Sequence, residues 1–297
     1  MLLARSEKAR TDIACSLECE GASPLTVGVF QMRNNCGGED AKRRNLERMI
    51  GAILATAEAG MQLLAFPEMC LPGYFTPVSG TPEEAILANR GLSDMVTQSA
   101  YLQNLQETAS EARIALAFGF CERDGDTLYN AIGVIDADGA WLGTRRKNPL
   151  YPWPYETDSF NEPGPEARAV VFKTKYATVG ISNCFDGEFL ESIRQMRLAG
   201  AGSLLWCNAG VGNAKLGTSN RINFSGAHAQ ANNMWVACCN CVAENTSGTS
   251  VIVSNNGEPL VILPPNEEAL GVATLDLGKT RHWDPWQSRV DRRGYQG

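Results

Sequence analysis

The chain has 297 residues, 44% of them hydrophobic, and a formal net charge of −7. A chain of this length can bury one large core, since single α/β domains of roughly 200 to 300 residues are common. The acidic balance argues against a nucleic-acid-binding surface, and no apolar run approaches the ~18 residues of a membrane span.

Hydrophobic periodicity predicts strands that alternate with helices, with antiparallel hairpins added. In the first half we expect strands at 25–32, 62–66 and 114–121, helices at 40–59 and 85–110, and a hairpin at 128–143. In the second half we expect strands at 203–207, 234–242 and 271–277, helices at 188–198 and 219–232, and a hairpin at 249–263. This order favours two sheets covered by helices. The Lys42-Arg43-Arg44 cluster is interpreted as the polar side of the first helix.

Residues 25–297 are expected to form one domain, and residues 1–24, which mix charges with small residues, a flexible extension or an interface arm. Most of the ten cysteines lie in or beside apolar stretches, as reduced core cysteines do, and no secretory signal with a clear apolar core is evident. These features predict a cytoplasmic protein. A zinc site in Cys238-Cys-Asn-Cys241 is disfavoured, because alternation along a strand places Cys238 on the opposite face from Cys239 and Cys241.

Cys184 is a candidate nucleophile, because an apolar run ends at this residue and a helical pattern begins directly after it. A side chain on such a turn is held out of the sheet, and the N–H groups that open the helix stabilise negative charge beside it. The alternative is an inert buried cysteine. The usual base is scarce: His228 and His282 are the two histidines, and both are interpreted as surface or hydrogen-bonded structural residues.

Two other segments offer charged partners for Cys184. Glu68 follows the short apolar run Leu63–Phe66, and Lys147 follows the hairpin. Sites in open α/β sheets collect beyond the carboxyl ends of strands, so a glutamate, a lysine and a cysteine placed there can converge.

The order Phe66-Pro-Glu68, Arg146-Lys147, then Asn183-Cys-Phe-Asp186 followed by Glu191 resembles the carbon-nitrogen hydrolase, or nitrilase, superfamily from about Leu25 onward. The resemblance implies a four-layer αββα sandwich and a Glu-Lys-Cys triad that needs no metal or organic cofactor. It also implies a homodimer or higher homo-oligomer, here with the helix after Cys184 and residues 281–295 at the interface.

The resemblance assigns a role to each residue. Glu68 would be general base and acid, Lys147 would stabilise the thiolate and the oxyanion, and the Phe185 N–H would be a second oxyanion donor. Glu156 matches the family's second glutamate, with Asp158 and Glu162 as alternatives, although its proline-rich loop suits a plain surface connection too.

Substrate preference is suggested by residues around the nucleophile. Cys184-Phe-Asp186 is more typical of amidase and N-carbamoyl branches than of nitrilases. Glu188 stands where several relatives with acidic substrates have arginine, so it favours an amine, a hydroxyl or a small neutral amide, unless it only complements the helix N-terminus. Further candidates for the pocket lining are Tyr74, Trp153, Tyr155 and Asn208.

Three functions are consistent with these residues. The leading one is a thiol hydrolase acting on a small carboxamide or an N-carbamoyl amine. The alternatives are a nitrilase with the same triad and a noncatalytic binding protein on the same fold.

Overall fold

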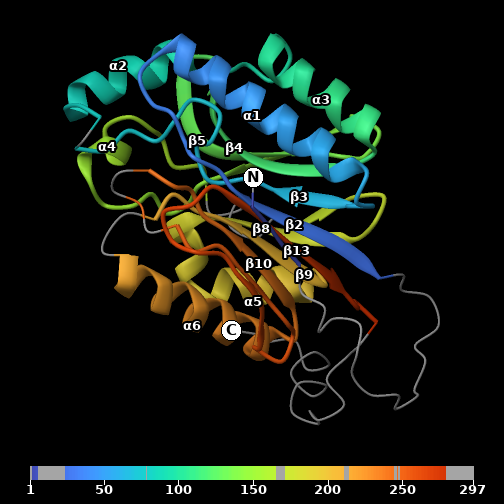
Figure 1. The fold of residues 1–297 in the computed structure, drawn as a ribbon. Helices are drawn as coiled ribbons and strands as arrows, with labels where there is room; N and C mark the ends of the chain where they lie inside the picture. Colours follow the sequence, from blue (N-terminus) through green and yellow to red (C-terminus); the bar gives the residue numbers. More distant parts are fainter. Residues whose placement is uncertain are drawn as a thin grey trace.

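The computed structural model describes residues 2–5, 24–77, 79–164, 171–210, 214–243, 246 and 248–278. Two β-sheets stack face to face in this part of the chain, and helices cover the outer face of each (Figure 1). This arrangement is the predicted four-layer sandwich. No helix within these ranges is both long and apolar enough to cross a membrane.

The first sheet has, in spatial order, β1 (Leu2–Arg5), β13 (Ala269–Leu275), β2 (Leu25–Gln31), β3 (Leu63–Ala65), β4 (Ala115–Asp124), β5 (Thr127–Ile135) and β6 (Trp141–Arg146). Strands β2, β3 and β4 are parallel, whereas β4, β5 and β6 form an antiparallel meander. Helices α1 (Glu39–Ala57), α2 (Pro82–Leu92) and α3 (Ala100–Ala112) lie on its outer side (Figure 1).

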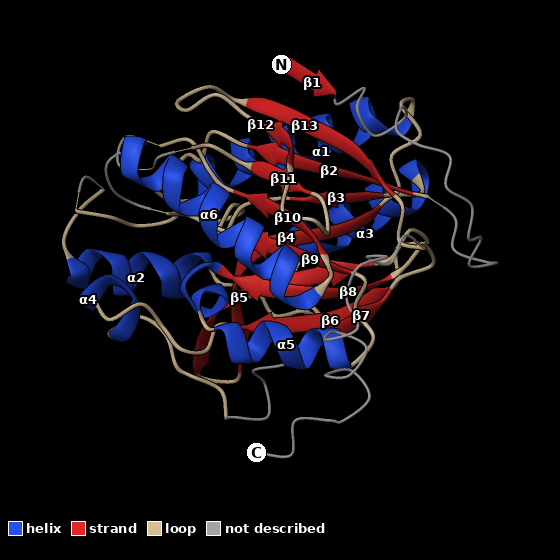
Figure 2. Ribbon diagram, turned by 90° about the horizontal axis from the view of Figure 1, so that it is seen from below, coloured by secondary structure: helices blue, strands red, loops and turns tan. Residues whose placement is uncertain are grey.

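The second sheet has the order β12 (Pro259–Ile262), β11 (Val251–Val253), β10 (Trp235–Cys239), β9 (Ser203–Cys207), β8 (Thr178–Asn183) and β7 (Val171–Lys173). Its central strands β8, β9 and β10 are parallel. Helices α5 (Leu190–Leu198) and α6 (Ala214–Asn232) cover its outer face, which is nearest the viewer in Figure 2.

Apolar alternation along the strands builds three core layers. Val27, Leu63, Ile181 and Leu205 belong to the cluster between the sheets, and separate clusters fill the space under the two helical layers. Cys239 belongs to the layer between the sheets, whereas Cys238 belongs to the layer under α5 and α6. The two sulfur atoms therefore lie on opposite faces of β10, as the strand period predicts.

The prediction of one continuous helix at 85–110 was wrong, because this segment forms two helices. Thr81 caps the start of α2 in a capping box with Glu84, and Ser99 caps the start of α3, so the chain makes two helices. The segment between them carries Asp94, whose Oδ1 forms an ion pair with Lys42 Nζ at 2.8 Å. Lys42 is only 3% exposed and points inward, which corrects its interpretation as part of a polar helix face.

Three short elements were not predicted. They are β1, β7 and α4 (Pro154–Thr157), each of three or four residues. Segments this short carry too few residues to show a hydrophobic period. Residues 6–23 and 279–297 lie outside the described residues, and with them His282 and the whole of the expected interface segment 281–295.

Candidate active site

Three strands of the two sheets end beside one another at the site. Glu68 follows β3, Lys147 follows β6 and Cys184 follows β8. Gly119 on β4 permits the close approach of the Glu68 segment, because a Cβ there would lie 2.0 Å from the backbone nitrogen of Met69.

Lys147 bridges two buried carboxylates. Its Nζ lies 2.7 Å from Glu68 Oε1 and 2.5 Å from Glu156 Oε1, and all three side chains are at most 1% exposed. Asn130 Nδ2 donates to Glu68 Oε1 at 2.7 Å, and the backbone N–H of Ala209 donates to Glu68 Oε2 at 3.0 Å. Both oxygens of Glu68 are thus fixed by donors from three different strands or loops.

Glu156 lies at the second carboxylate position, and two more donors hold it there. Tyr74 donates its hydroxyl to Glu156 Oε1 at 2.5 Å, and the N–H of Tyr151 donates to Oε2 at 2.8 Å. Of the alternatives, Glu162 instead accepts from the N–H of Leu150, and Asp158 is exposed. The structure therefore brings Glu156, and neither alternative, to Lys147.

The surroundings favour the charged form of Lys147 and the protonated form of Glu68. Burial alone would lower the pKa of Lys147, but Glu156 and Glu68 raise it above its ordinary value. The pKa of Glu68 is raised, chiefly by burial and further by Glu156, while Lys147 opposes the increase. A raised carboxyl pKa lies nearer neutral pH, which suits a group that accepts and returns a proton.

Cys184 occupies a strained turn at the end of β8. Its φ of 52° lies in the left-handed region, and residues 184–188 form a 3₁₀ turn before α5. Trp206 Nε1 donates to the Cys184 carbonyl at 2.7 Å. Asp186 Oδ1 accepts from the Ser182 hydroxyl and the Asn183 N–H, each at 2.7 Å. These bonds hold the turn on both sides of the thiol.

The surroundings of Cys184 favour the protonated form of its thiol. Burial raises its pKa well above the ordinary value, Glu68 raises it further, and Lys147 opposes this. Cys184 is nevertheless partly exposed, whereas Cys70, Cys121, Cys207 and the three cysteines from 238 to 241 are buried. A thiol with a raised pKa is mostly protonated at neutral pH, so its use as a nucleophile would require a neighbouring group that accepts the proton.

The turn depends on a buried ion pair, and this gives a stability prediction. Arg145 Nη2 lies 2.9 Å from Asp186 Oδ2, and both side chains are fully buried. Asp186→Asn is expected to lower the free energy of unfolding by about 3–5 kcal/mol, because it leaves the guanidinium without a counter-charge in the interior. Urea unfolding followed by circular dichroism measures this.

The control for Asp186→Asn is Asp138→Asn. Asp138 pairs with Lys175 at 2.7 Å, but both side chains are about half exposed, so this variant should unfold close to wild type. Equal unfolding free energies for the two variants would contradict a structural role of the Arg145–Asp186 pair.

A pocket of about 180 Å³ opens above Cys184. Its lining comes from the segment after β3, the Cys184 turn, the end of β9 and the α6 helix, and includes Tyr74, Phe185, Glu188, Asn208 and Arg221. Four of the predicted lining residues are therefore brought together. Tyr155 is not among those that line it, since its hydroxyl donates to the Gly80 carbonyl at 2.7 Å. Trp153 packs on Tyr151 and Tyr155 and is likewise absent from the lining.

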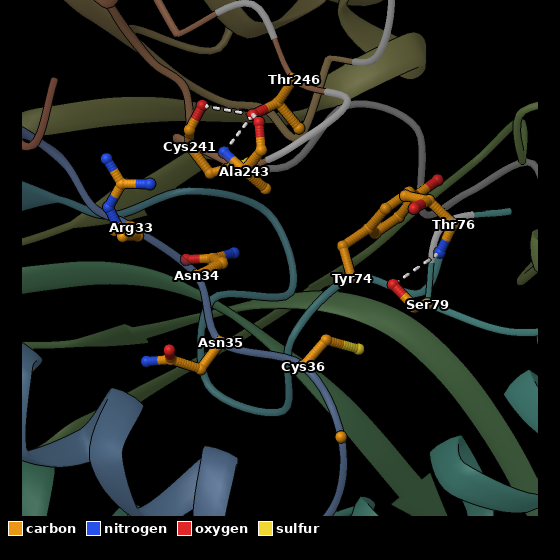
Figure 3. Close-up of a pocket in the computed structure, with 11 residues that line it drawn as sticks. Arg33, Asn34, Asn35, Cys36, Tyr74, Thr76, Ser79, Cys241, Ala243 and Thr246 are labelled. Atoms are coloured by element: carbon orange, nitrogen blue, oxygen red, sulfur yellow. Dashed lines mark hydrogen bonds between the residues drawn. The ribbon is translucent and has the colours of Figure 1, made fainter. Parts of the chain in front are cut away.

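A second cavity, of about 360 Å³, adjoins the first at Tyr74 (Figure 3). Segments that follow β2 and β10 form its walls, including Arg33, Cys36 and Thr246. The Thr246 hydroxyl donates to the Cys241 carbonyl at 3.0 Å and accepts from the Ala243 N–H, which joins this wall together.

Sequence reasoning missed three residues that shape the site. Asn130 is a buried amide within an apolar strand, and that polar interruption was a usable signal. The sequence carried no such signal for Trp206 and Arg221, because their contacts come from elements distant in the chain. His228 is buried and hydrogen-bonded to the Gly187 carbonyl at 2.7 Å, so it is structural and not a surface residue.

Sequence comparisons place this arrangement among known proteins. A family model described as carbon-nitrogen hydrolase matches residues 26–285. The chain is 32% identical over 186 residues to a citrullinase of Francisella tularensis subsp. tularensis, covering 62% of this chain and 61% of that protein. It is 31% identical over 207 residues to an N-carbamoylputrescine amidase of Solanum tuberosum, covering 62% and 68%. It is 32% identical over 166 residues to a bromoxynil-specific nitrilase of Klebsiella pneumoniae subsp. ozaenae, covering 55% and 46%.

The match thus spans about three fifths of the citrullinase and under half of the nitrilase. Solved structures show the same fold. An amidase from Nesterenkonia sp. superposes with a TM-score of 0.68 at 23% identity, covering 90% of this chain and 95% of its own. A Saccharomyces cerevisiae member of branch 10 of the nitrilase superfamily has a TM-score of 0.74 at 19% identity, covering 93% and 98%.

Proposed function

The chain belongs to the carbon-nitrogen hydrolase family, and from this premise we propose that it cleaves the C–N bond of a small carboxamide or N-carbamoyl amine through a thioester at Cys184. One observation carries the proposal. A buried ammonium group, Lys147, bridges two carboxylates, and all three charges act on a partly exposed thiol. A structural ion-pair network would not need a cysteine held at positive φ beside it.

The proposed reaction has two halves. Glu68 accepts the thiol proton, and the Cys184 sulfur attacks the carbonyl carbon of the substrate. Lys147 and the Phe185 N–H stabilise the resulting oxyanion. The C–N bond then breaks, and ammonia or an amine leaves with the proton from Glu68. Glu68 next takes a proton from water, which hydrolyses the thioester and releases the acid and the free thiol.

Amide chemistry is preferred over nitrile hydrolysis. The Cys-Phe-Asp order at 184–186 supports it, as do the names of two relatives, a citrullinase and an N-carbamoylputrescine amidase. The nitrilase among the relatives makes nitriles a necessary part of the test.

The test is ammonia release from primary amides, N-carbamoyl amines and nitriles of matched size. We expect release from amides or carbamoyl amines, together with a mass increase on Cys184 when the reaction is quenched early. Release from nitriles alone would favour a nitrilase. No release from any class, with an unreactive Cys184, would overturn the proposal in favour of a binding protein.

We also propose a homodimer or higher homo-oligomer that pairs through α5. Phe189, Leu190 and Leu198 at this helix are large apolar side chains with 39–50% of their surface exposed. Light scattering coupled to gel filtration would measure the mass of the assembly, and a monomer at micromolar concentration would contradict the proposal.

Glu156→Gln is expected to move the acid limb of the kcat/KM profile to lower pH. The reaction requires ionised Glu68, so activity falls as pH drops through its pKa. Glu156 raises that pKa, and removing its charge lowers it, which keeps the base ionised at more acidic pH. The variant should also reduce kcat by up to about 100-fold, because Lys147 loses one of its two carboxylate partners.

Glu162→Gln provides the matched control for this profile. It lies on the same loop but bonds only the Leu150 N–H among the described contacts, so its acid limb should coincide with wild type. An acid limb in Glu156→Gln that stays in place or moves to higher pH would contradict the assigned coupling.

A further inference from the structure

Asn130 contacts the segments of all three buried charges at the site. It lies on β5, and its side chain is fully buried. Its Nδ2 donates to Glu68 Oε1 at 2.7 Å and lies 3.4 Å from Glu156 Oε1. Its backbone carbonyl accepts from the Lys147 N–H at 2.8 Å. One residue of the first sheet therefore meets both carboxylates and the backbone that carries the ammonium group.

A second buried amide links Asn130 to the nucleophile. Asn183 is the last residue of β8 and directly precedes Cys184. Its Nδ2 donates to Asn130 Oδ1 at 2.9 Å, and its side chain is fully buried. Because β5 belongs to the first sheet and β8 to the second, this hydrogen bond joins the two sheets at the site.

The neighbours of Asn130 permit one orientation of its amide. Carboxylates only accept hydrogen bonds, so the NH₂ group must face Glu68 and Glu156, and the carbonyl must face the NH₂ group of Asn183. Turning the amide over would place acceptor against acceptor on one side and donor against donor on the other. Unmade hydrogen bonds are costly in a buried cluster, so the side chain of Asn130 is fixed.

The same contacts decide which oxygen of Glu68 is free to take a proton. Oε1 already accepts from Lys147 Nζ and Asn130 Nδ2, each at 2.7 Å, which uses both of its lone pairs. Among the described residues, only the Ala209 N–H donates to Oε2, at 3.0 Å. Ala209 also lines the pocket above Cys184, and its N–H favours the thiolate. Oε2 therefore keeps a lone pair beside the pocket wall.

We propose that Asn130 is a positioning residue: it fixes Glu68 Oε1, leaves Oε2 to take the Cys184 proton, and joins the base to the strand that ends at the nucleophile. This inference rests on the proposed hydrolase function and adds a residue outside the Glu-Lys-Cys set. Neither Asn130 nor Asn183 is part of the pocket lining, so both act through Glu68 and Cys184 and not on the substrate.

Asn130→Leu removes the amide from a side chain of similar size. The hydrogen bond from Asn130 favours ionised Glu68 and lowers its pKa, so its loss raises that pKa. Activity needs the ionised carboxylate and should then be lost at a higher pH. On the amide or N-carbamoyl amine that the wild type hydrolyses fastest, we expect the acid limb of kcat/KM to move up by about one pH unit, opposite to Glu156→Gln. We also expect kcat to fall about 100-fold, with KM changed by less than about twofold.

Asn183→Leu tests the other half of the link. It leaves every described donor to Glu68 in place, so the acid limb should stay near that of the wild type while kcat falls about 10-fold. The double variant Asn130→Leu/Asn183→Leu should lose no more kcat than Asn130→Leu alone, because Asn183 acts through Asn130. Asn130→Ala, which cannot clash, replaces Asn130→Leu in these comparisons if leucine prevents folding.

Asn45→Leu controls for the loss of a buried amide as such. Asn45 is also fully buried, and its Nδ2 donates to the carbonyls of Asn35 at 2.8 Å and Leu71 at 3.1 Å, outside the catalytic cluster. This variant should unfold at lower urea concentration, as Asn130→Leu does, but its acid limb should coincide with that of the wild type.

The outcomes distinguish this inference from the proposed function. An acid limb that stays in place in the folded Asn130 variant, with turnover that requires Cys184, would overturn the positioning role and leave the hydrolase intact. An equal displacement in Asn45→Leu would overturn it as well, and additive losses of kcat in the double variant would overturn the link through Asn183. No ammonia release by the wild-type protein from any substrate class would overturn the proposed function and the inference with it.

Discussion

Replacing Cys184 with alanine is expected to lower kcat by about 10⁶-fold, the loss typical of removing a catalytic nucleophile. Without the sulfur there is no acceptor for the acyl group, and the remaining charges of Glu68 and Lys147 cannot form a thioester. The fold should persist. The turn is held by the Cys184 carbonyl and by Asp186, and neither contact uses the sulfur. Ammonia release and urea unfolding on the same preparation measure both effects.

Cys36→Ala is the matched control for Cys184→Ala. Cys36 is the other described cysteine that is partly exposed, and it lines the second cavity and not the Cys184 pocket. This variant should retain turnover. Substantial activity in Cys184→Ala would disprove the thioester mechanism.

The second large effect is expected for Glu68→Gln, which should reduce kcat/KM by about 10²- to 10⁴-fold. The glutamine has nearly the same shape but cannot take the thiol proton. Its amide NH₂ group would also face one of the three groups that now donate to the carboxylate, and two donors cannot form a hydrogen bond with each other. Lys147 keeps Glu156 as a partner, so the protein should still fold.

Alkylation of Cys184 tests the role of Glu68 directly, because two roles predict opposite results. As a base, Glu68 accelerates thiolate formation, and the variant should react more slowly with iodoacetamide at pH 7. As a negative neighbour only, Glu68 raises the thiol pKa, and its removal should speed the reaction. We expect the slower rate, measured by intact mass against Glu191→Gln. A faster rate would remove Glu68 from the base role.

Short-range sequence patterns predicted most of the strands and helices. The strands that end near Glu68, Lys147 and Cys184 were predicted because alternation and turn residues are legible within a few neighbours. The boundaries of β9 agree with the expected 203–207, and α6 begins earlier than expected. The break between α2 and α3 was missed, because the Lys42–Asp94 ion pair joins residues 52 positions apart.

The alternation of strands and helices could be read from the chain alone, and so could the order in which a glutamate, a lysine and a cysteine reach strand ends. Three features could not: which second carboxylate meets Lys147, the neutralisation of Asp186 by Arg145, and the presence of Arg221 and Glu188 in one pocket. The difference lies in the sequence distance over which each interaction acts. Backbone period and turn chemistry act between neighbours in the chain, whereas ion pairs and pocket walls form between residues that only the packing of the two sheets and their helices brings together.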